Sequence, residues 1–518
     1  MEDVELVLGL ILLSIGARLC AMFPHRRFLT CAPVGDAITY YQLITYYQQK
    51  NRKSYDERCL MGTDAINVPN WYQRICAVLF SKELLFKKPF LPNLLFFVAS
   101  VLIFFLVIGI NPSAIFGNDV VNVSILVTAL VFMLSLNNVN FDEESIHFLT
   151  LAPRFLGKVS ASFTVFFTWL YMINDGIHWF VFAVIFTIIS LMSSLFARQA
   201  VLFLLIVWSI LSMTFAPVLV LFLSVVVCFF VFGKEFVPSV KGHYDFSINW
   251  VHRDLVYRTK LSEIFTRHFL KTNPPKEVIR ELFDGRVLRI AYFPEVLILV
   301  AFLFASDGVG SDIKYQLFVP VLSALVIWFV TSLRKYAFLG EGYRYITFTQ
   351  YFYLPFAIGY LTPYVNETFT YVVLCAFFLY VAIITTYKLF HKASWIVTDG
   401  EDKLSEFLDK FPLPTDAIIY SVHYRVGEEV LARGYGAKSF AYQQGNHGKE
   451  INDKYFEEYP YLKIDWKPLF KEYNVTHVIV EKESLMGIGL KYDYSGLNLV
   501  GESDYYILYE VPKSYATS

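Results

Sequence analysis

Charged residues are scarce in this sequence. Asp, Glu, Lys and Arg together make up 17% of its 518 residues, and the formal net charge is −1. A net charge so close to zero does not indicate a polyanionic partner. The sequence also has no run of Lys and Arg of the kind found in arms that bind nucleic acid. We therefore expect no nucleic-acid partner.

Cysteine is rare as well. The six cysteines are scattered, with no C-x-x-C pair and no cluster with His, which disfavours a metal or redox centre. Cys31 and Cys59 share one hydrophilic segment and could pair if that segment faces an oxidising compartment. The N-terminus lacks the basic segment and cleavage site of a secretory signal peptide, so residues 4–22 are predicted to form a retained transmembrane helix.

Apolar residues, by contrast, are abundant. Hydrophobic residues make up 56% of the chain and aromatic residues 18%, and the mean hydropathy is +0.48, which indicates a polytopic membrane protein. A run of about 20 apolar residues crosses a hydrocarbon core of about 30 Å. Runs that reach or approach this length are 4–22, 92–110, 119–137, 156–173, 177–196, 200–215, 217–233, 291–306, 317–333, 350–361 and 369–390. We predict about eleven transmembrane helices, with the two termini on opposite sides.

The segments between these runs are unequal. Those on one side are long and charged, and the main ones are 23–91, 138–155 and 234–290. Those on the other side are very short, and Lys314 is their only Lys or Arg. We therefore expect most of the chemistry at one membrane face, within a transmembrane domain over 1–392.

Residues 393–518 have the composition of a soluble domain. The segments DAIIYSVHY, AKSFAYQQ, THVIVEK, LNLVGES and YYILYEV are typical of strands, and KLSEFLDKF, GEEVLARGY and WKPLFKEYN are typical of helices. This pattern predicts a small α/β domain. It holds no G-x-G-x-x-G or G-x-x-x-x-G-K-[ST] motif, so a lid or an acceptor-binding module is the better interpretation than a nucleotide site.

Asp36 begins the segment DAITYYQLITYY, whose apolar and aromatic residues recur at helical spacing. Such a helix suits the membrane interface, with its aromatic rings at headgroup depth. Asp is a common cap near the first turn of a helix. A carboxylate where a membrane segment opens into water is also a candidate catalytic group, and the residues alone leave both interpretations open.

A second group of acids, Asp142, Glu143 and Glu144, lies in FDEESIHFLTLAPR between the third and fourth runs. Asp and Ser are ordinary helix-start residues, so capping explains the pattern. Alternatively, a second carboxylate brought near Asp36 would orient an acceptor hydroxyl or bind a divalent cation such as Mg²⁺ or Mn²⁺. No cofactor is implied with certainty.

The segment RKYAFLGEGYRYITF, between the ninth and tenth runs, combines Arg334, Glu341 and Arg344 with several tyrosines. Basic and aromatic residues often anchor the end of a span. A guanidinium at headgroup depth also suits the phosphate of a lipid, because its planar fork matches two phosphate oxygens. Arg198, in SSLFARQA, is predicted to lie in a very short turn (197–199) on the same face.

Taken in order, these features resemble the GT-C superfamily of integral-membrane glycosyltransferases, whose sugar donor is linked to a polyprenyl phosphate. The segments that carry the resemblance are GARLC, VGDAITYYQ, FARQA, LGEGYRY, YNVTHVIVEKESL and LNLVGESDYYILYEV. The first holds Arg18, at the outer end of the first run. Each segment is unspecific alone, and their shared order carries the resemblance.

The resemblance implies a catalytic role for Asp36, as the general base that takes the proton of an acceptor hydroxyl, with inversion at the anomeric carbon. It also implies a cationic clamp on the departing phosphate, formed by Arg344 with Arg198 or Arg334. Glu341 joins the acids at 142–144 as a candidate for orienting the acceptor or a metal.

The implied activity is that of a hexosyl- or pentosyltransferase, acting on a glycan, lipid or protein acceptor at the extracytoplasmic face. The implied N-terminus is cytoplasmic and the C-terminal domain extracytoplasmic, whereas the positive-inside rule, counted over the short loops, gives the opposite orientation. The alternatives are an inactive GT-C-like binding protein and a non-catalytic transporter or flippase of lipid-linked glycans. A transporter would be expected to hold ionisable residues or helix breaks near the bilayer midplane.

Overall fold

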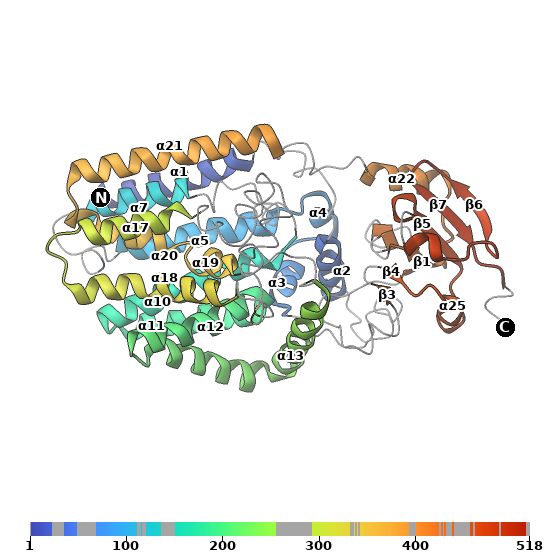
Figure 1. Cartoon of the computed structure of the whole chain (residues 1–518), viewed down its shortest axis with the longest axis horizontal. Helices are drawn as coiled ribbons and strands as arrows, with labels where there is room; N and C mark the ends of the chain where they lie inside the picture. Colours follow the sequence, from blue (N-terminus) through green and yellow to red (C-terminus); the bar gives the residue numbers. More distant parts are fainter. Residues whose placement is uncertain are drawn as a thin grey trace, which may run out of the picture.

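The structure is a computed structural model that describes residues 2–22, 36–48, 69–110, 115, 121–135, 151–254, 293–331, 336, 339, 342–392, 400–423, 426–427, 429–430, 438–439, 456–458, 461–485 and 488–513. Within these residues the chain forms a helical bundle, followed by a small domain built on a sheet (Figure 1). Most of the predicted loops 23–91, 138–155 and 234–290 lie outside the described residues.

Each of the eleven predicted apolar runs coincides with a helix of the bundle. The helices are α1 (Glu2–Met22), α5 (Leu91–Ile110), α7 (Val121–Leu134), α10 (Pro153–Asn174), α11 (Ile177–Ser193), α12 (Leu195–Ser212), α13 (Ala216–Asp254), α17 (Pro294–Ala305), α18 (Ser311–Thr331), α20 (Tyr353–Leu361) and α21 (Glu367–Lys392). In the described part of the chain six helices, α5, α10, α12, α13, α18 and α21, are long and apolar enough to cross a membrane. The chain is therefore an integral membrane protein.

Short connections lie at the end of the bundle that holds the N-terminus (Figure 1). Asp175 closes α10 in the left-handed conformation (φ 49°), and Met213 closes α12 in the same way (φ 52°). The amide of Asp307 donates to the carbonyl of Tyr364 over 2.9 Å, which ties two of these connections together. This arrangement confirms the predicted face of short loops.

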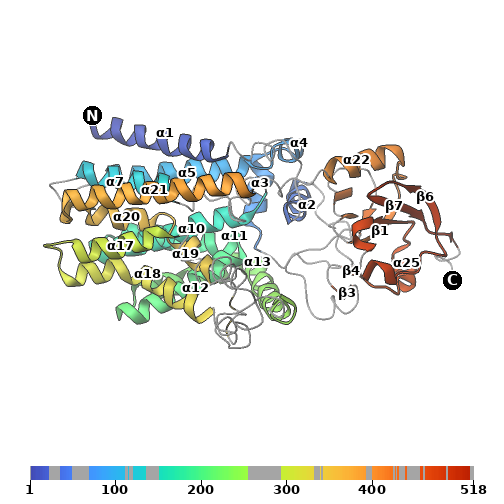
Figure 2. The ribbon, with the colours of Figure 1, turned by 45° about the horizontal axis from the view of Figure 1, so that its top comes forward.

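The opposite end carries α2 (Asp36–Gln48), α3 (Trp71–Leu79) and α4 (Lys82–Lys87), and the C-terminal domain lies beyond them (Figures 1 and 2). Helix α2 buries Ile38, Tyr41 and Ile44 against Tyr72 and Cys76 of α3. Burial raises the pKa of Tyr41 to about 12, so its hydroxyl stays neutral at physiological pH.

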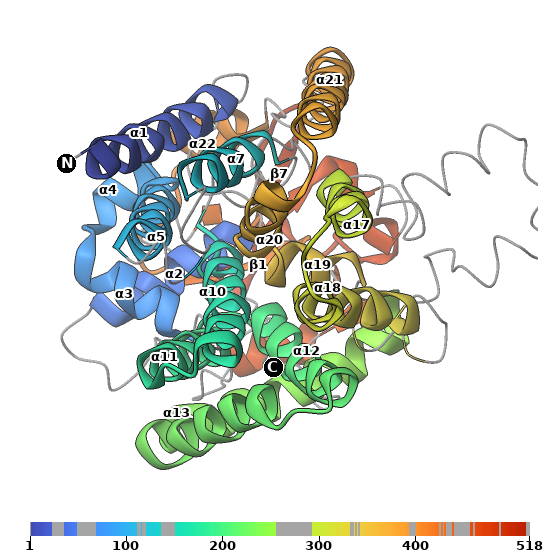
Figure 3. The ribbon, with the colours of Figure 1, turned by 90° about the vertical axis from the view of Figure 1, so that its left-hand side faces the viewer.

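Viewed from the N-terminal end, α10 and α20 lie in the middle of the bundle (Figure 3). Helix α10 meets α11 through small hydroxyl residues: Ser190 Oγ donates to Ser160 Oγ over 2.9 Å, and Thr187 Oγ1 donates to Thr164 Oγ1 over 3.2 Å. Small side chains let helix backbones approach closely in a membrane, where the hydrophobic effect does not drive helices together.

The C-terminal domain has a five-stranded sheet in the order β2-β1-β5-β7-β6. Its strands are β1 (Ile418–Val422), β2 (Lys438–Ser439), β5 (His477–Glu481), β6 (Asn498–Glu502) and β7 (Tyr506–Glu510), each inside a predicted strand segment. Helices α22 (Gly400–Lys410) and α25 (Lys467–Tyr473) match two predicted helices, and the third, GEEVLARGY, lies mostly outside the described residues. The pair β3 (Phe456–Glu458) and β4 (Tyr461–Leu462) was not predicted.

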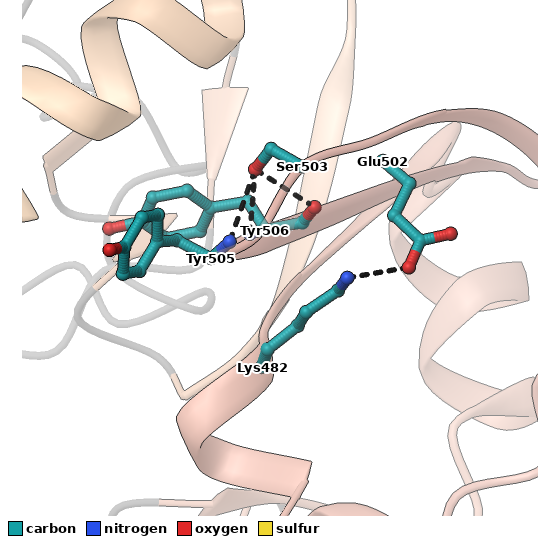
Figure 4. A network of polar contacts seen from close by, with 5 residues as sticks. All are labelled: Lys482, Glu502, Ser503, Tyr505 and Tyr506. Atoms are coloured by element: carbon teal, nitrogen blue, oxygen red, sulfur yellow. Dashed lines mark hydrogen bonds and ion pairs between the residues drawn. The ribbon is translucent and has the colours of Figure 1, made fainter.

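A polar network closes the β6–β7 hairpin (Figure 4). Ser503 Oγ accepts hydrogen bonds from the amides of Tyr505 and Tyr506, and Lys482 Nζ pairs with Glu502 Oε1 at 2.5 Å. The amide of Lys482, at the start of the 3₁₀ helix η5 (Lys482–Leu485), also donates to the carbonyl of Tyr505. The network therefore fixes the edge of the sheet to the segment that follows β5.

Two predicted boundaries are wrong. The predicted turn at 197–199 is helical, because α12 begins at Leu195, and Arg198 therefore lies in its first turn. The apolar run predicted to end at residue 233 ends too early, because α13 continues past a kink at Phe232 (φ −117°, ψ 18°) to Asp254. Charged and polar residues lower the local hydropathy at both places, although the chain there is helical.

Candidate functional site

A small pocket, partly open to solvent, has helix α2 as one of its walls. Its walls come from four segments. These are α2, the start of α3 with the preceding Pro69, the start of α10, and the junction between α11 and α12. Residues far apart in the sequence therefore meet at one place near the predicted membrane interface.

Two long helices begin at this pocket. Pro153 occupies the first turn of α10, and Ser194 is the N-terminal cap of α12. The first amides of a helix lack partners within the helix, and the helix dipole adds partial positive charge there. Together the two helix starts favour an anion in the pocket.

Two arginines meet at one aromatic ring of the pocket wall. The Arg154 guanidinium lies 4.9 Å from the centre of the Phe196 ring, and that of Arg344, from α19 (Tyr343–Thr349), lies 4.1 Å from the same ring. Guanidinium groups stack well on aromatic faces. The ring thus holds two positive charges beside the starts of α10 and α12, which strengthens the preference for an anion.

Two buried polar atoms of the wall have no hydrogen-bond partner among the residues that the structure describes. They are Gln73 Oε1 and Ser193 Oγ, and their side chains are 1% and 0% exposed. Both residues line the pocket. Buried polar groups in native proteins are almost always paired, so these two atoms indicate a ligand with complementary groups.

Asp36 is the first residue of α2. Thr39, Tyr40 and Leu43 of the pocket wall follow it by three, four and seven residues, which is the spacing of one helix face. The catalytic candidate predicted from sequence therefore begins the helix that forms one wall of the pocket.

The structure places the other predicted site residues as follows. Arg344 contacts the pocket wall, whereas Arg198 is buried behind it. Outside the described residues lie Arg334, Glu341, Asp142, Glu143, Glu144, Cys31 and Cys59. Within the described ranges no group of three His, Cys, Asp or Glu side chains could hold a metal.

Arg198 makes four hydrogen bonds within the bundle. Its guanidinium donates twice to the carbonyl of Leu191, at the end of α11, over 2.7 and 2.8 Å. It also donates to the carbonyl and to Oγ of Ser239 in α13, over 2.9 and 2.7 Å. The residue therefore ties the α11–α12 junction, and with it the pocket wall, to α13.

The sequence reasoning missed Arg154, Phe196, Gln73 and Ser193 as site residues. Arg154 had one signal, since it follows the proline that starts a helix at the charged face. Phe196, Gln73 and Ser193 had none, because an aromatic, an amide and a hydroxyl residue are ordinary at the end of a span.

A second cationic cluster lies deeper in the bundle. Lys158, one turn after Arg154, holds its ammonium 4.3 Å from the centre of the Tyr351 ring, and Arg18 is only 6% exposed. Arg18 also interacts electrostatically with Tyr351. Charged side chains buried in a membrane span almost always face the interior of the bundle.

Gly157→Ala is expected to destabilise the protein by about 1–3 kcal/mol through overpacking. A Cβ at Gly157 would lie 2.7 Å from Cβ of Ser194 and 2.8 Å from Cβ of Ala197, so α10 and the pocket wall would be forced apart. Thermal unfolding in detergent measures the effect. Gly9→Ala is the matched control, since nothing lies within 4 Å of its added Cβ, and equal shifts for both variants would contradict the account.

Arg198→Met is expected to destabilise the protein by about 2–4 kcal/mol, because each buried acceptor left without a donor costs about 1–3 kcal/mol. The acceptors are the carbonyl of Leu191 and the two oxygens of Ser239. Lys241→Met, on the exposed face of α13, should leave the unfolding temperature unchanged. An unfolding temperature of Arg198→Met equal to that of the wild type would contradict the tie between α12 and α13.

Comparison with solved structures finds two forms of one protein. The chain is similar to ArnT from Cupriavidus metallidurans in the apo state, with a TM-score of 0.45, 11% identity and coverage of 100% of both chains. It is also similar to ArnT from Cupriavidus metallidurans bound to undecaprenyl phosphate, with a TM-score of 0.42, 12% identity and coverage of 98% of this chain and 99% of the other. No family model and no curated protein matches the chain.

Proposed function

We propose that this integral membrane protein is a GT-C-type glycosyltransferase, which moves one sugar from a polyprenyl-phosphate donor to a glycan, lipid or protein acceptor. The observation that carries the proposal is the pairing of Arg154 and Arg344 on Phe196, in a pocket whose other wall is the helix that begins with Asp36. This transfer needs an anion-binding group and a carboxylate, and the acid that we assign to it begins the helix of the pocket's other wall.

The reaction follows from these two groups. Asp36 takes the proton of the acceptor hydroxyl as its oxygen forms a bond to the anomeric carbon. The bond between that carbon and the phosphate oxygen breaks on the opposite face, so the configuration inverts and polyprenyl phosphate departs. Arg154, Arg344 and the first amides of α10 and α12 stabilise the negative charge that develops on the phosphate.

Other parts of the chain also have roles in the proposed reaction. Arg198 holds the α11–α12 junction through Leu191 and Ser239, so we assign it a positioning role in place of direct contact with phosphate. Arg334 remains a candidate for a further phosphate contact, and the acids at 142–144 with Glu341 remain candidates for orienting the acceptor. The C-terminal domain lies at the same end of the bundle as α2 (Figure 2) and would cover the pocket.

Transfer of a labelled sugar tests this function. Purified protein in detergent is incubated with undecaprenyl phosphates that carry tritiated hexoses or pentoses and with an extract of membrane glycans and lipids. The proposal predicts that label moves to an acceptor and that free undecaprenyl phosphate appears in equal amount. Unchanged donor in every reaction, with intact protein, would contradict it.

Orientation provides a separate test. We expect reporter fusions after Lys392 to be active on the extracytoplasmic side, since the donor lipid and its acceptor are expected there. A phosphatase reporter that needs an oxidising compartment should be active, and a cytoplasmic fluorescent reporter should be dark. The reverse result would agree with the positive-inside count and contradict a GT-C assignment.

A transporter of lipid-linked glycans is the second candidate, and one observation favours it. Glu295 lies in the first turn of α17 and is 1% exposed. Helices α17 and α20 have 12 and 9 residues, or about 18 and 14 Å of rise, shorter than a hydrocarbon core. Buried acids and short helices are features of transport pathways. Glu295→Gln should stop movement of a labelled lipid across liposomes if transport is the function, and should leave sugar transfer intact if catalysis is.

A further inference from the structure

We propose that Gln73 and Ser193 form a subsite for the hydroxyl groups of the donor sugar, next to the arginines that face its phosphate. This inference rests on the proposed function and names the residues that would distinguish the glycosylated lipid from the bare lipid phosphate. The evidence is the chemistry of two buried atoms in the pocket wall.

Ser193 stands apart from the other hydroxyl residues near it. Ser190 Oγ, on the same helix, lies 2.9 Å from Ser160 Oγ and 2.9 Å from the carbonyl of Phe186, so its one proton has an acceptor in either direction. Ser160 in turn donates to the carbonyl of Gly157 over 3.1 Å. Ser193 Oγ is equally buried, yet has no partner among the described residues. Two buried hydroxyl groups of α10 and α11, those of Thr168 and Ser193, thus have no partner among the described residues, and of these two Ser193 lines the pocket.

Gln73 is held rigidly in the wall by its neighbours on α3. Arg74 Nη1 pairs with Glu235 Oε1 of α13 at 2.6 Å, and its guanidinium lies 5.0 Å from the centre of the Tyr47 ring in α2. Trp71 meets Phe232 edge to face, with ring centres 4.9 Å apart. Helix α3 is therefore fixed on two sides, which holds the backbone of Gln73 beside the pocket.

The type of ligand group follows from what each atom lacks. An amide oxygen only accepts hydrogen bonds, and a hydroxyl can donate and accept. A sugar linked to a lipid through phosphate is a phosphodiester, which has no N–H or O–H group of its own. The phosphate therefore cannot satisfy Gln73 Oε1, and its negative charge would repel that oxygen. A sugar hydroxyl or amine can satisfy it, and the same ring presents oxygens to Ser193.

The position of the two residues agrees with a phosphate and a sugar bound side by side. Ser193 directly precedes Ser194, the cap of α12, and lies three residues before Phe196, which carries both arginines. The pocket thus has an anion-binding side and an uncharged hydrogen-bonding side within one turn of chain. A ligand that bears a negative charge next to a polyhydroxylated ring matches both.

Binding in detergent, followed by native mass spectrometry, tests the subsite. The probes are undecaprenyl phosphate and a panel of undecaprenyl phosphates that carry glucose, mannose, galactose or arabinose. Gln73→Met and Ser193→Ala should each weaken binding of the glycosylated lipid that the wild type binds best by about tenfold, the scale of one lost hydrogen bond. Neither variant should change the Kd for undecaprenyl phosphate. Gln316→Met is the matched control, since Gln316 Oε1 also lacks a partner among the described residues but lies in the second turn of α18, outside the pocket. It should change neither Kd.

The outcomes separate the subsite from the proposed function. Three results would contradict the subsite. In the first, both variants keep the wild-type affinity for every glycosylated lipid. In the second, they lose affinity equally for glycosylated and bare lipid phosphate, and in the third no glycosylated lipid binds to the wild type. If the wild type binds undecaprenyl phosphate and transfers sugar in either of the first two cases, the proposed function stands. If no glycosylated lipid binds to the wild type, the proposed function fails together with the subsite. If the wild type does not bind undecaprenyl phosphate at all, the proposed function fails and the subsite falls with it. Unfolding temperatures of the variants ensure that folded proteins are compared.

Discussion

Asp36→Asn is expected to lower the rate of sugar transfer by about 10²- to 10⁴-fold, the usual contribution of a general base. Asn caps a helix nearly as well as Asp, so the start of α2 should stay intact. The substitution therefore removes the proton acceptor and keeps the cap. Transfer of label from the donor lipid measures the rate. Thermal unfolding measures whether the stability that the cap contributes is kept.

This design separates the two interpretations of Asp36. If the residue is only a cap, Asp36→Asn should transfer sugar at the wild-type rate, and Asp36→Ala should lose about 0.5–2 kcal/mol of stability. Asp312→Asn is the matched control, because Asp312 also lies in the first turn of a helix, α18, at the other end of the bundle. It should leave transfer unchanged.

Arg344→Gln and Arg154→Gln are each expected to raise the Kd for undecaprenyl phosphate by about 10- to 100-fold, since a hydrogen bond to a charged group contributes about 1.5–3 kcal/mol. The two guanidiniums share the Phe196 ring, so their effects should not add independently, and the double variant should reveal the coupling. Because Lys241 is exposed and does not line the pocket, its charge should contribute little, and Lys241→Gln should bind as the wild type does.

One result would contradict the role of the two arginines in binding the phosphate. Unchanged affinity in both single variants would mean that the lipid phosphate binds elsewhere, with the deeper cluster of Lys158 and Arg18 as the next place to examine. If only Arg344→Gln loses affinity for undecaprenyl phosphate, the phosphate binds at α19 and the start of α10 has no role in binding.

Much of the fold could be predicted from the sequence because its strongest signal is hydropathy. Long apolar runs form helices in a membrane, since every backbone group must be paired within the segment, and each predicted run is helical. The strands β1 and β5 to β7 were predicted from short β-branched and aromatic segments. The start of α12 was missed because Arg198 and Gln199 lower the hydropathy of its first turn, although the arginine is buried and makes four hydrogen bonds inside the bundle.

The candidate site was only partly predictable. Arg344 and Asp36 had local signals, an arginine among aromatics and an acid before an amphipathic helix. The partnership of Arg154 with Arg344 had none, because it depends on how α10, α12 and α19 pack together. Gln73 and Ser193 became candidates only through the absence of a partner, which is a property of the folded pocket and cannot be inferred from sequence spacing.

The central claim is that one pocket binds the phosphate of a lipid between Arg344 and the start of α2. An experimental structure of the full chain with undecaprenyl phosphate tests it most directly. The account predicts phosphate density within hydrogen-bond distance of Arg154 and Arg344, above the first turns of α10 and α12, with Asp36 facing the same pocket. Phosphate density at the end of the bundle that holds the N-terminus, or Asp36 turned away from the lipid, would contradict it.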